Sequence, residues 1–167
     1  GRIQEGPAAD LAGELGLDIA ARNRWTEALD AAARGGEPGT AALLIADLDH
    51  FKQINDAYGH GVGDEVLVSL ARLVETSLRG CDHLGRWGGE EFMILARELD
   101  HEGTLQFANR VRLAVANVRF AVAAPVSISM GATLLHAHES PRQWLERADQ
   151  GLYLAKQAGK NRCVLCP

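Results

Sequence analysis

One stretch constrains the fold of this chain more than any other: the apolar run Ala41–Leu48. It follows glycine- and proline-rich turn sequence at residues 35–39, and it is short enough to be a β-strand. A strand that is apolar on both faces must be buried on both, so the run predicts a sheet that is covered on each side. Two aspartates, Asp47 and Asp49, close the run.

The other patterns predict helices and strands around this central strand. Apolar residues at helical spacing indicate helices at residues 10–33, 64–78, 105–118 and 141–158, and the last begins with a capping box formed by Ser140 and Gln143. Strands are indicated at residues 82–97, folded as a hairpin about Gly88-Gly89, at Val126–Met130 and at Arg162–Leu165. Residues 51–63 have the composition of a loop with at most one helical turn. The order predicts an α/β domain of the α+β kind, with a central, mainly antiparallel sheet of about five strands flanked by helices.

Length and composition are those of a single globular domain. A chain of 167 residues fits one core, with residues 1–39 as a helical lead-in and loop and residues 40–167 as the main body. The net charge of −5, with scattered lysines and arginines, argues against a nucleic-acid partner. No apolar stretch approaches the ~20 residues that span a bilayer, so we expect a cytoplasmic domain without membrane contact. Because the chain opens at Gly1 rather than at Met, we expect it to be the output domain of a larger sensor protein.

Four acidic side chains are expected at neighbouring strand ends. Asp47 and Asp49 end one strand, and Glu90 and Glu91 follow the glycine turn. Like charges repel, and such a cluster is tolerated when a hard cation lies in it; Mg²⁺ prefers one or two carboxylates together with water and phosphate oxygens. The pattern therefore favours phosphoryl or nucleotidyl transfer. The alternative interpretation is that these acids merely end strands in solvent.

Five motifs follow one another along residues 40–166. The most specific is Gly88-Gly89-Glu90-Glu91-Phe92, and the others lie at residues 47–56, 58–67, 127–131 and 147–161. Together they resemble the GGDEF family of diguanylate cyclase domains, in the Gly-Gly-Glu-Glu-Phe form of its signature. The resemblance implies a fold like that of nucleotide cyclases and polymerase palm domains, with residues 40–167 as the catalytic core.

The same resemblance implies an enzyme that condenses two GTP molecules into cyclic di-GMP, a bacterial second messenger, with release of two pyrophosphates. It implies a Mg²⁺ site, which Mn²⁺ could also occupy, formed by Asp47, Glu90, Glu91 and the carbonyl of Leu48. Glu90 is also implied as the base toward the ribose 3′-hydroxyl. Because one domain holds one GTP, catalysis is expected to need a homodimer.

Further residues match substrate-binding positions of the family. These are the guanine readers Asn55 and Asp64, the phosphate-binding Lys52, Lys156 and Lys160, and the glycines Gly88 and Gly89, which let the triphosphate approach the backbone. Several of them have a purely structural alternative. Asp64 is also a candidate N-cap of its helix, Asn55 a candidate turn cap, and lysines at a helix end favour its dipole.

A second site is implied just before the signature. Arg79-Gly80-Cys81-Asp82 resembles the family's Arg-x-x-Asp inhibitory site, with Asp82 six residues before Gly88. The resemblance implies feedback inhibition by cyclic di-GMP, with Arg110 as a second arginine supplied to that site from a neighbouring subunit. The alternative for Arg110 is a solvated helix face.

The chain departs from the family pattern at residues 18–25. Where family members have Leu-Thr-Gly-Leu-x-Asn-Arg-Arg, only Asn23-Arg24 is present here. This departure leaves open the alternative of a catalytically weak GGDEF domain that acts as a receptor for cyclic di-GMP or GTP. A second alternative is a structural module for dimerisation or partner docking, in which the acids are only surface charge.

Overall fold

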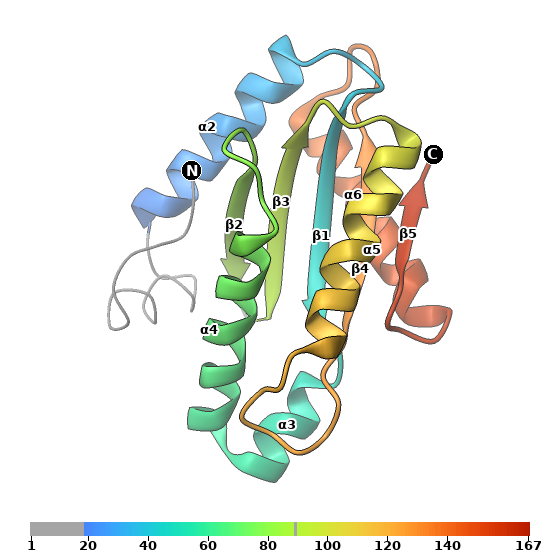
Figure 1. Ribbon diagram of the computed structural model, residues 1–167. Coiled ribbons are helices and arrows are strands. Elements are labelled where there is room, and N and C mark those ends of the chain that lie inside the picture. The colour runs from blue at the N-terminus through green and yellow to red at the C-terminus, as the bar shows by residue number, and fades with distance from the viewer. Residues whose placement is uncertain (1–18, 89) are drawn as a thin grey trace.

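A single mixed sheet organises the molecule. The computed structural model describes residues 19–88 and 90–167 (Figure 1). The strands are β1 Ala41–Leu48, β2 His83–Gly88, β3 Glu91–Arg97, β4 Ile128–Leu134 and β5 Cys163–Cys166, in the order β2-β3-β1-β4-β5. β1 is central and runs antiparallel to both β3 and β4, whereas β5 joins β4 in parallel. The prediction of a mainly antiparallel five-stranded sheet is therefore confirmed.

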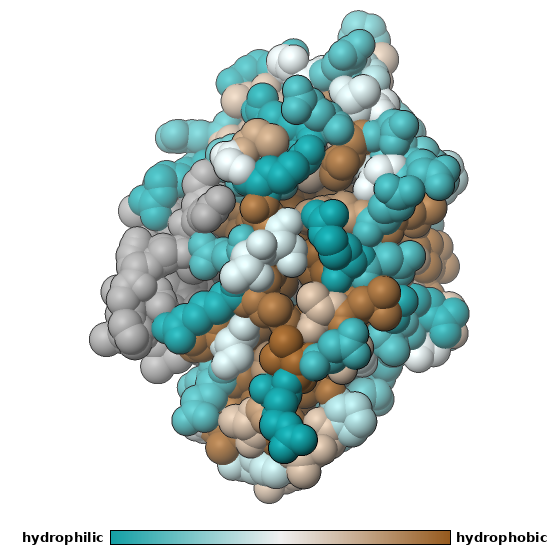
Figure 2. Space-filling model, viewed as in Figure 1, coloured by the Kyte–Doolittle hydropathy of each residue, from teal (hydrophilic) through white to brown (hydrophobic). Residues whose placement is uncertain are grey.

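Helices cover both faces of this sheet. They are α2 Ile19–Gly35, α3 Phe51–Tyr58, α4 His60–Thr76, α5 His101–Asn117 and α6 Pro141–Gln157. Figure 1 shows α4 and α5 in front of the sheet and α6 behind it. In the same view, Figure 2 shows apolar side chains between α4 and α5, over the middle of the sheet. None of the helices in the described part of the chain has the length and apolar character needed to cross a bilayer.

The core is divided in two by the alternation of side chains along β1. Leu44 and Leu48 point into the cluster under α4 and α5, whereas Leu43 and Ile45 point into the cluster under α2 and α6. All four side chains are at most 2% exposed. The continuous apolar run thus reflects burial on both faces, as expected.

Some element boundaries differ from those expected from the sequence. Residues 51–63 are not a loop, because α3 occupies 51–58 and α4 already begins at His60. Asp64 is therefore inside α4 and not its N-cap; the N-cap is Gly59, without a side-chain hydrogen bond. β4 continues through Gly131 to Leu134, and β5 is shifted by one residue toward the C-terminus. The part of the first helix expected at residues 10–18 lies outside the described residues.

The C-terminal helix α6 packs against the sheet at backbone distance. A Cβ atom on Gly131 of β4 would lie 2.1 Å from both Ala148 O and Leu152 N of α6. The helix begins with the expected capping box, in which Ser140 Oγ accepts from Gln143 N and Ser140 N donates to Gln143 Oε1. The position of α6 matters for the site, because it carries Lys156.

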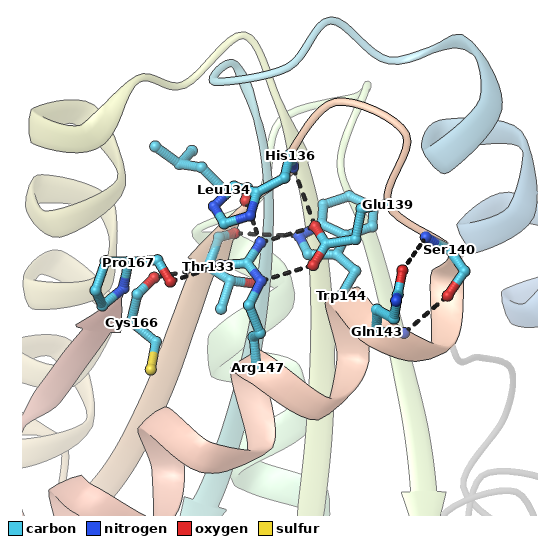
Figure 3. Close-up of polar contacts among 10 residues, drawn as sticks. All are labelled: Thr133, Leu134, His136, Glu139, Ser140, Gln143, Trp144, Arg147, Cys166 and Pro167. Atoms are coloured by element: carbon cyan, nitrogen blue, oxygen red, sulfur yellow. Dashed lines mark hydrogen bonds and ion pairs between the residues drawn. The ribbon is translucent and has the colours of Figure 1, made fainter.

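A polar cluster also holds the first half of α6 (Figure 3). The Arg147 guanidinium bonds to Glu139 and donates to the carbonyls of Leu134, at 2.6 Å, and Pro167, at 3.1 Å. Nearby, the indole of Trp144 is fully buried and its Nε1 lies 3.4 Å from Thr133 O. Arg147 thereby ties α6 to the ends of β4 and β5.

Candidate active site

The site is built at the end of β1, where the sheet brings three predicted acids together. Asp47 lies directly opposite Glu91 in the β1–β3 ladder, and Leu48 N is 3.4 Å from Glu90 O. Residues directly opposite in an antiparallel pair have side chains on the same face, with Cβ atoms about 4.5–5.5 Å apart. This is the face that α6 covers. The spatial relation expected between the strand end and the glycine hairpin is present.

Asp47 is in an environment that opposes its ionisation. Its side chain is only 15% exposed, and burial raises its pKa to about 7, with the negative charges of Glu90 and Glu91 acting in the same direction. The ammonium of Lys156, 3.3 Å from Asp47 Oδ2, lowers the pKa but does not cancel the effect of burial. Burial likewise raises the pKa of Glu91, with Asp149 and Glu90 adding to the shift. The positive charge of Lys156 therefore compensates only part of the negative charge of these carboxylates.

The donor set fits a hard divalent cation. The Oδ1 atom of Asp47 is buried and has no hydrogen-bond partner among the described residues. Carboxylate oxygens are the ligands that Mg²⁺ prefers, and this ion retains several waters rather than requiring a complete protein cage. In keeping with that, residues 19–88 and 90–167 contain no group of three His, Cys, Asp or Glu side chains already arranged around one ion position. Asp47 and its neighbours Glu90 and Glu91 would supply one side of the coordination sphere.

Asp49 has a structural role that the sequence did not reveal. It is 2% exposed, and its carboxylate accepts from Ser129 Oγ at 2.6 Å, Ser127 Oγ at 2.7 Å and Asn161 N at 3.0 Å. Burial alone would raise its pKa, but the hydrogen bonds from Ser129, Ser127 and Asn161 outweigh it and lower the pKa. Asp49 therefore fixes the end of β1 to β4 and to the turn after α6. The alternation Ser127-x-Ser129 was the only signal of this role in the sequence.

The three candidate phosphate-binding lysines have different surroundings. Lys156 projects from the end of α6 to Asp47 and Asp49. Lys52 is on α3, where its 86% exposed side chain pairs with Asp56 at 3.1 Å. Lys160 lies in the turn after α6, with a φ of 66°. Of these three lysines, Lys156 alone forms ion pairs with Asp47 and Asp49 in the described part of the chain.

The two candidate guanine readers lie on consecutive helices. Asn55 is on α3 and Asp64 on α4, and both are partly exposed. Asn55 Oδ1 is buried without a hydrogen-bond partner in the described part of the chain, so its side chain is not the turn cap considered above. A Cβ on Gly63 would lie 1.8 Å from Asn55 Oδ1, so glycine at this position leaves room for the amide in the orientation that it has here. Asn55 thus lies against Gly63, the residue before Asp64, with its acceptor unused in the described part of the chain.

The second predicted site is assembled around a buried aspartate. Asp82 is 2% exposed, and Arg79 binds it through both Nε, at 3.1 Å from Oδ2, and Nη2, at 3.0 Å from Oδ1. The pair raises the pKa of Arg79. Arg110 of α5 is exposed, points its Nη2 toward Ser77 O at 3.4 Å and stacks on Phe107. The three residues lie around the α4–β2 junction, away from the end of β1.

The hairpin glycines complete the predicted set. Gly88 is the last residue of β2, and the ladder has an irregularity between Arg86 and Gly88. Gly89 lies outside the described residues.

The fold and the acidic strand end define the class of this domain. A mixed five-stranded sheet flanked by helices, with carboxylates where the central strand meets a glycine hairpin, is a palm-like α+β fold. The family described as "Diguanylate cyclase, GGDEF domain" matches residues 18–162. The chain belongs to the GGDEF family.

Similar proteins come from several bacteria. The chain is 43% identical over 125 residues to the probable diguanylate cyclase DgcC of Escherichia coli, across 73% of this chain and 34% of DgcC. It resembles the active GGEEF domain of a diguanylate cyclase from Vibrio cholerae, with a TM-score of 0.73 and 33% identity over 92% of this chain and 94% of that one. The GGDEF domain of DgcB from Caulobacter crescentus, in complex with c-di-GMP, has a TM-score of 0.79 and 28% identity over 86% and 89% of the two chains. This chain spans about a third of the length of the curated relatives it matches.

Proposed function

We propose that this domain is a Mg²⁺-dependent diguanylate cyclase that condenses two GTP molecules into cyclic di-GMP. The observation that carries the proposal is the buried Asp47 carboxylate, which faces Glu91, is adjacent to Glu90 and has one oxygen without a partner in the described part of the chain. Family membership and relatives named as diguanylate cyclases support the same activity. Because GTP is an intracellular nucleotide, we place the proposed activity in the cytoplasm.

In the proposed reaction, each 3′-hydroxyl oxygen attacks the α-phosphorus of the other nucleotide. A new O–P bond forms, the bond from that phosphorus to the bridging oxygen of pyrophosphate breaks, and the hydroxyl proton passes to Glu90. A bound divalent cation would lower the pKa of the hydroxyl and neutralise the leaving pyrophosphate. Asp47, Glu91 and the Leu48 carbonyl would hold it beside Glu90. The protein's main contribution is then to orient two rigidly held substrates.

The substrate-binding roles follow from the chemistry of the side chains. Asp64 would accept from guanine N1–H and N2–H, which adenine lacks, and Asn55 would use its unpaired Oδ1 for a further contact to the base. Lys52, Lys156 and Lys160 would neutralise the phosphates, and Gly88 and Gly89 would let the triphosphate approach the hairpin backbone. A homodimer is required because one such site holds only one of the two nucleotides.

Feedback inhibition is proposed at the second site. The Arg79 fork and the Asp82 carboxylate are suited to a guanine edge or a phosphate, with Arg110 provided by a second subunit. The DgcB domain whose structure contains c-di-GMP shows that a member of this family binds the compound. In this chain Arg79 already pairs with Asp82, so ligand binding would exchange part of that pair for contacts to the nucleotide.

The test is direct. The purified chain is incubated with GTP and Mg²⁺ at high protein concentration, and cyclic di-GMP is quantified by chromatography, with Glu90→Gln as the inactive reference. Product that depends on Glu90 supports the cyclase. Tight binding of cyclic di-GMP or GTP without any product would favour the receptor alternative, and the absence of both binding and product would favour the structural module.

A further inference from the structure

A lysine ammonium lies close to two carboxylates at the end of β1. Lys156 Nζ lies 3.3 Å from Asp47 Oδ2 and 3.4 Å from Asp49 Oδ1. Both distances exceed the about 2.7–2.9 Å of a charge-assisted hydrogen bond, so the ammonium is attracted by charge without being closely bonded. Its side chain is 25% exposed, which leaves it a path toward solvent.

The two carboxylates depend on Lys156 to different degrees. Asp49 has three other hydrogen-bond donors, from Ser127, Ser129 and Asn161, and would keep its position without the lysine. Asp47 has no such support: its Oδ1 is unpaired among residues 19–88 and 90–167, and Glu91 lies opposite it. Lys156 is therefore the counterion of Asp47 in particular.

We propose that Lys156 is a built-in counterion that a divalent cation displaces from Asp47, and that the released ammonium then binds the triphosphate. This inference rests on the proposed function. An ammonium and a divalent cation compete for the same carboxylate, and repulsion between them drives the lysine outward when the metal binds. Because metal and triphosphate both favour the displaced position of Lys156, each increases the affinity for the other. Lys156 is thus a positioning residue that couples the two ligands.

The first test measures metal binding without nucleotide. Free Mn²⁺ is followed by electron paramagnetic resonance during titration of the wild-type chain and of Lys156→Met, which removes the charge and keeps an apolar stem. We expect Lys156→Met to bind Mn²⁺ more tightly, by about five- to tenfold, because the competing cation is gone. Equal or weaker binding would overturn the proposal. Asp47→Asn in the Lys156→Met background should abolish the gain, and a gain that survives would also overturn it.

A matched control lies on the same helix. Arg142 pairs with Glu146 through Nε and Oε1 at 3.2 Å, and its side chain is 87% exposed. Arg142→Met removes one positive charge from α6 about 20 Å from Lys156, at a rise of about 1.5 Å per residue. Its Mn²⁺ affinity should equal that of wild type. A gain as large as that of Lys156→Met would mean that net charge, and not exchange, sets the affinity.

A second measurement uses only wild-type protein, in case Lys156→Met does not fold. Lysines are acylated briefly with and without Mg²⁺, and the modification of Lys156 and Lys52 is quantified by peptide mass spectrometry. Mg²⁺ alone should increase modification of Lys156 and leave modification of Lys52 unchanged. Unchanged or decreased modification of Lys156 overturns the proposal.

The Mn²⁺ titration also separates failure of the exchange from failure of the proposed function. If no Mn²⁺ binds to any variant, the metal site of the proposed function fails and the exchange fails with it. If wild type and Lys156→Met bind Mn²⁺ equally tightly while the wild-type chain retains cyclase activity, the exchange alone is rejected.

Discussion

The Arg147 guanidinium binds both carboxylate oxygens of Glu139, with Nε 2.6 Å from Oε2 and Nη2 2.8 Å from Oε1. Arg147 is 18% exposed and Glu139 only 6% exposed, so water screens this pair weakly. The same guanidinium donates to Leu134 O and Pro167 O. This relationship secures the N-terminal half of α6, while Asp47 and Asp49 pair with Lys156 near its C-terminal end.

Glu139→Gln should destabilise the fold at neutral pH. Burial alone would raise the pKa of Glu139, but the hydrogen bonds and charge of Arg147 lower it below its usual 4.5. A lowered pKa stabilises the folded state above pH 4.5, and that contribution is lost as the pH falls through the folded-state value. We expect a loss of about 1–3 kcal/mol in unfolding free energy at pH 7, measured by urea denaturation, and a smaller difference near pH 3. Glu146→Gln, which breaks the exposed pair with Arg142, should change stability by less than about 0.5 kcal/mol.

Asp47→Asn should abolish product formation and stabilise the metal-free protein. The pKa of Asp47 is raised from 3.8 to about 7, mainly by burial, so its ionisation opposes folding above pH 4 and does so fully above pH 7. We expect a gain of about 1–3 kcal/mol at pH 8 in EDTA that shrinks as the pH approaches 4, measured by urea denaturation across that range. A variant that is less stable than wild type at pH 8 would contradict this.

Gly131→Ala should separate α6 from the sheet. The added Cβ would lie 2.1 Å from two backbone atoms of α6, a contact that no rotamer change relieves. We expect a loss of about 3 kcal/mol in unfolding free energy. We also expect the activity of the folded protein to fall, because Lys156 moves with the helix. Gly35→Ala is the control: nothing lies within 4 Å of the added Cβ at the end of α2, and stability should change by less than about 1 kcal/mol.

Arg79→Ala should weaken inhibition by cyclic di-GMP and also reduce stability. The Asp82 side chain is fully buried, and without the guanidinium it retains the backbone N–H of Arg79, at 2.9 Å, as its main donor. We expect the inhibition constant to rise at least about tenfold, and stability to fall by about 1–3 kcal/mol. Inhibition assays and melting curves on Arg79→Ala and Arg79→Lys measure both effects. Lysine restores charge without the two-pronged geometry, so it should recover stability more than inhibition. An unchanged inhibition constant in Arg79→Ala would remove Arg79 from the proposed site.

The sequence predicted the sheet better than it predicted the helices beside the site. The short apolar run Ala41–Ala46, placed between turn sequence and Asp47, favours a strand buried on both faces, and the bounds of the strand, Ala41–Leu48, were predicted to the residue. Residues 51–63 were predicted as loop because Gly59, Gly61 and Gly63 lower helix propensity. A glycine at position 63 has a different role from marking a loop: it makes room for Asn55 between two helices. That requirement exists only once α3 and α4 are packed together.

The candidate site shows the same limit. The acids were predicted from their positions at strand ends, which are visible locally in the apolar run before Asp47 and in the glycine turn before Glu90. The role of Asp49 depends on Ser127, Ser129 and Asn161, which lie 78, 80 and 112 residues further along the chain. Such partners are fixed by tertiary packing, and spacing within one motif does not reveal them.

Because side chains alternate along β1, the register of this strand determines which face each residue occupies. Asp47 shares the α6 face with Leu43 and Ile45, so the acid and the packing residues are in phase. A slip of one residue in the pairing of β1 would exchange the two faces of the strand and turn Asp47 toward α4 and α5. Insertion or deletion of a single residue within β1 that is not taken up by a β-bulge would therefore disrupt the core and the acidic site together.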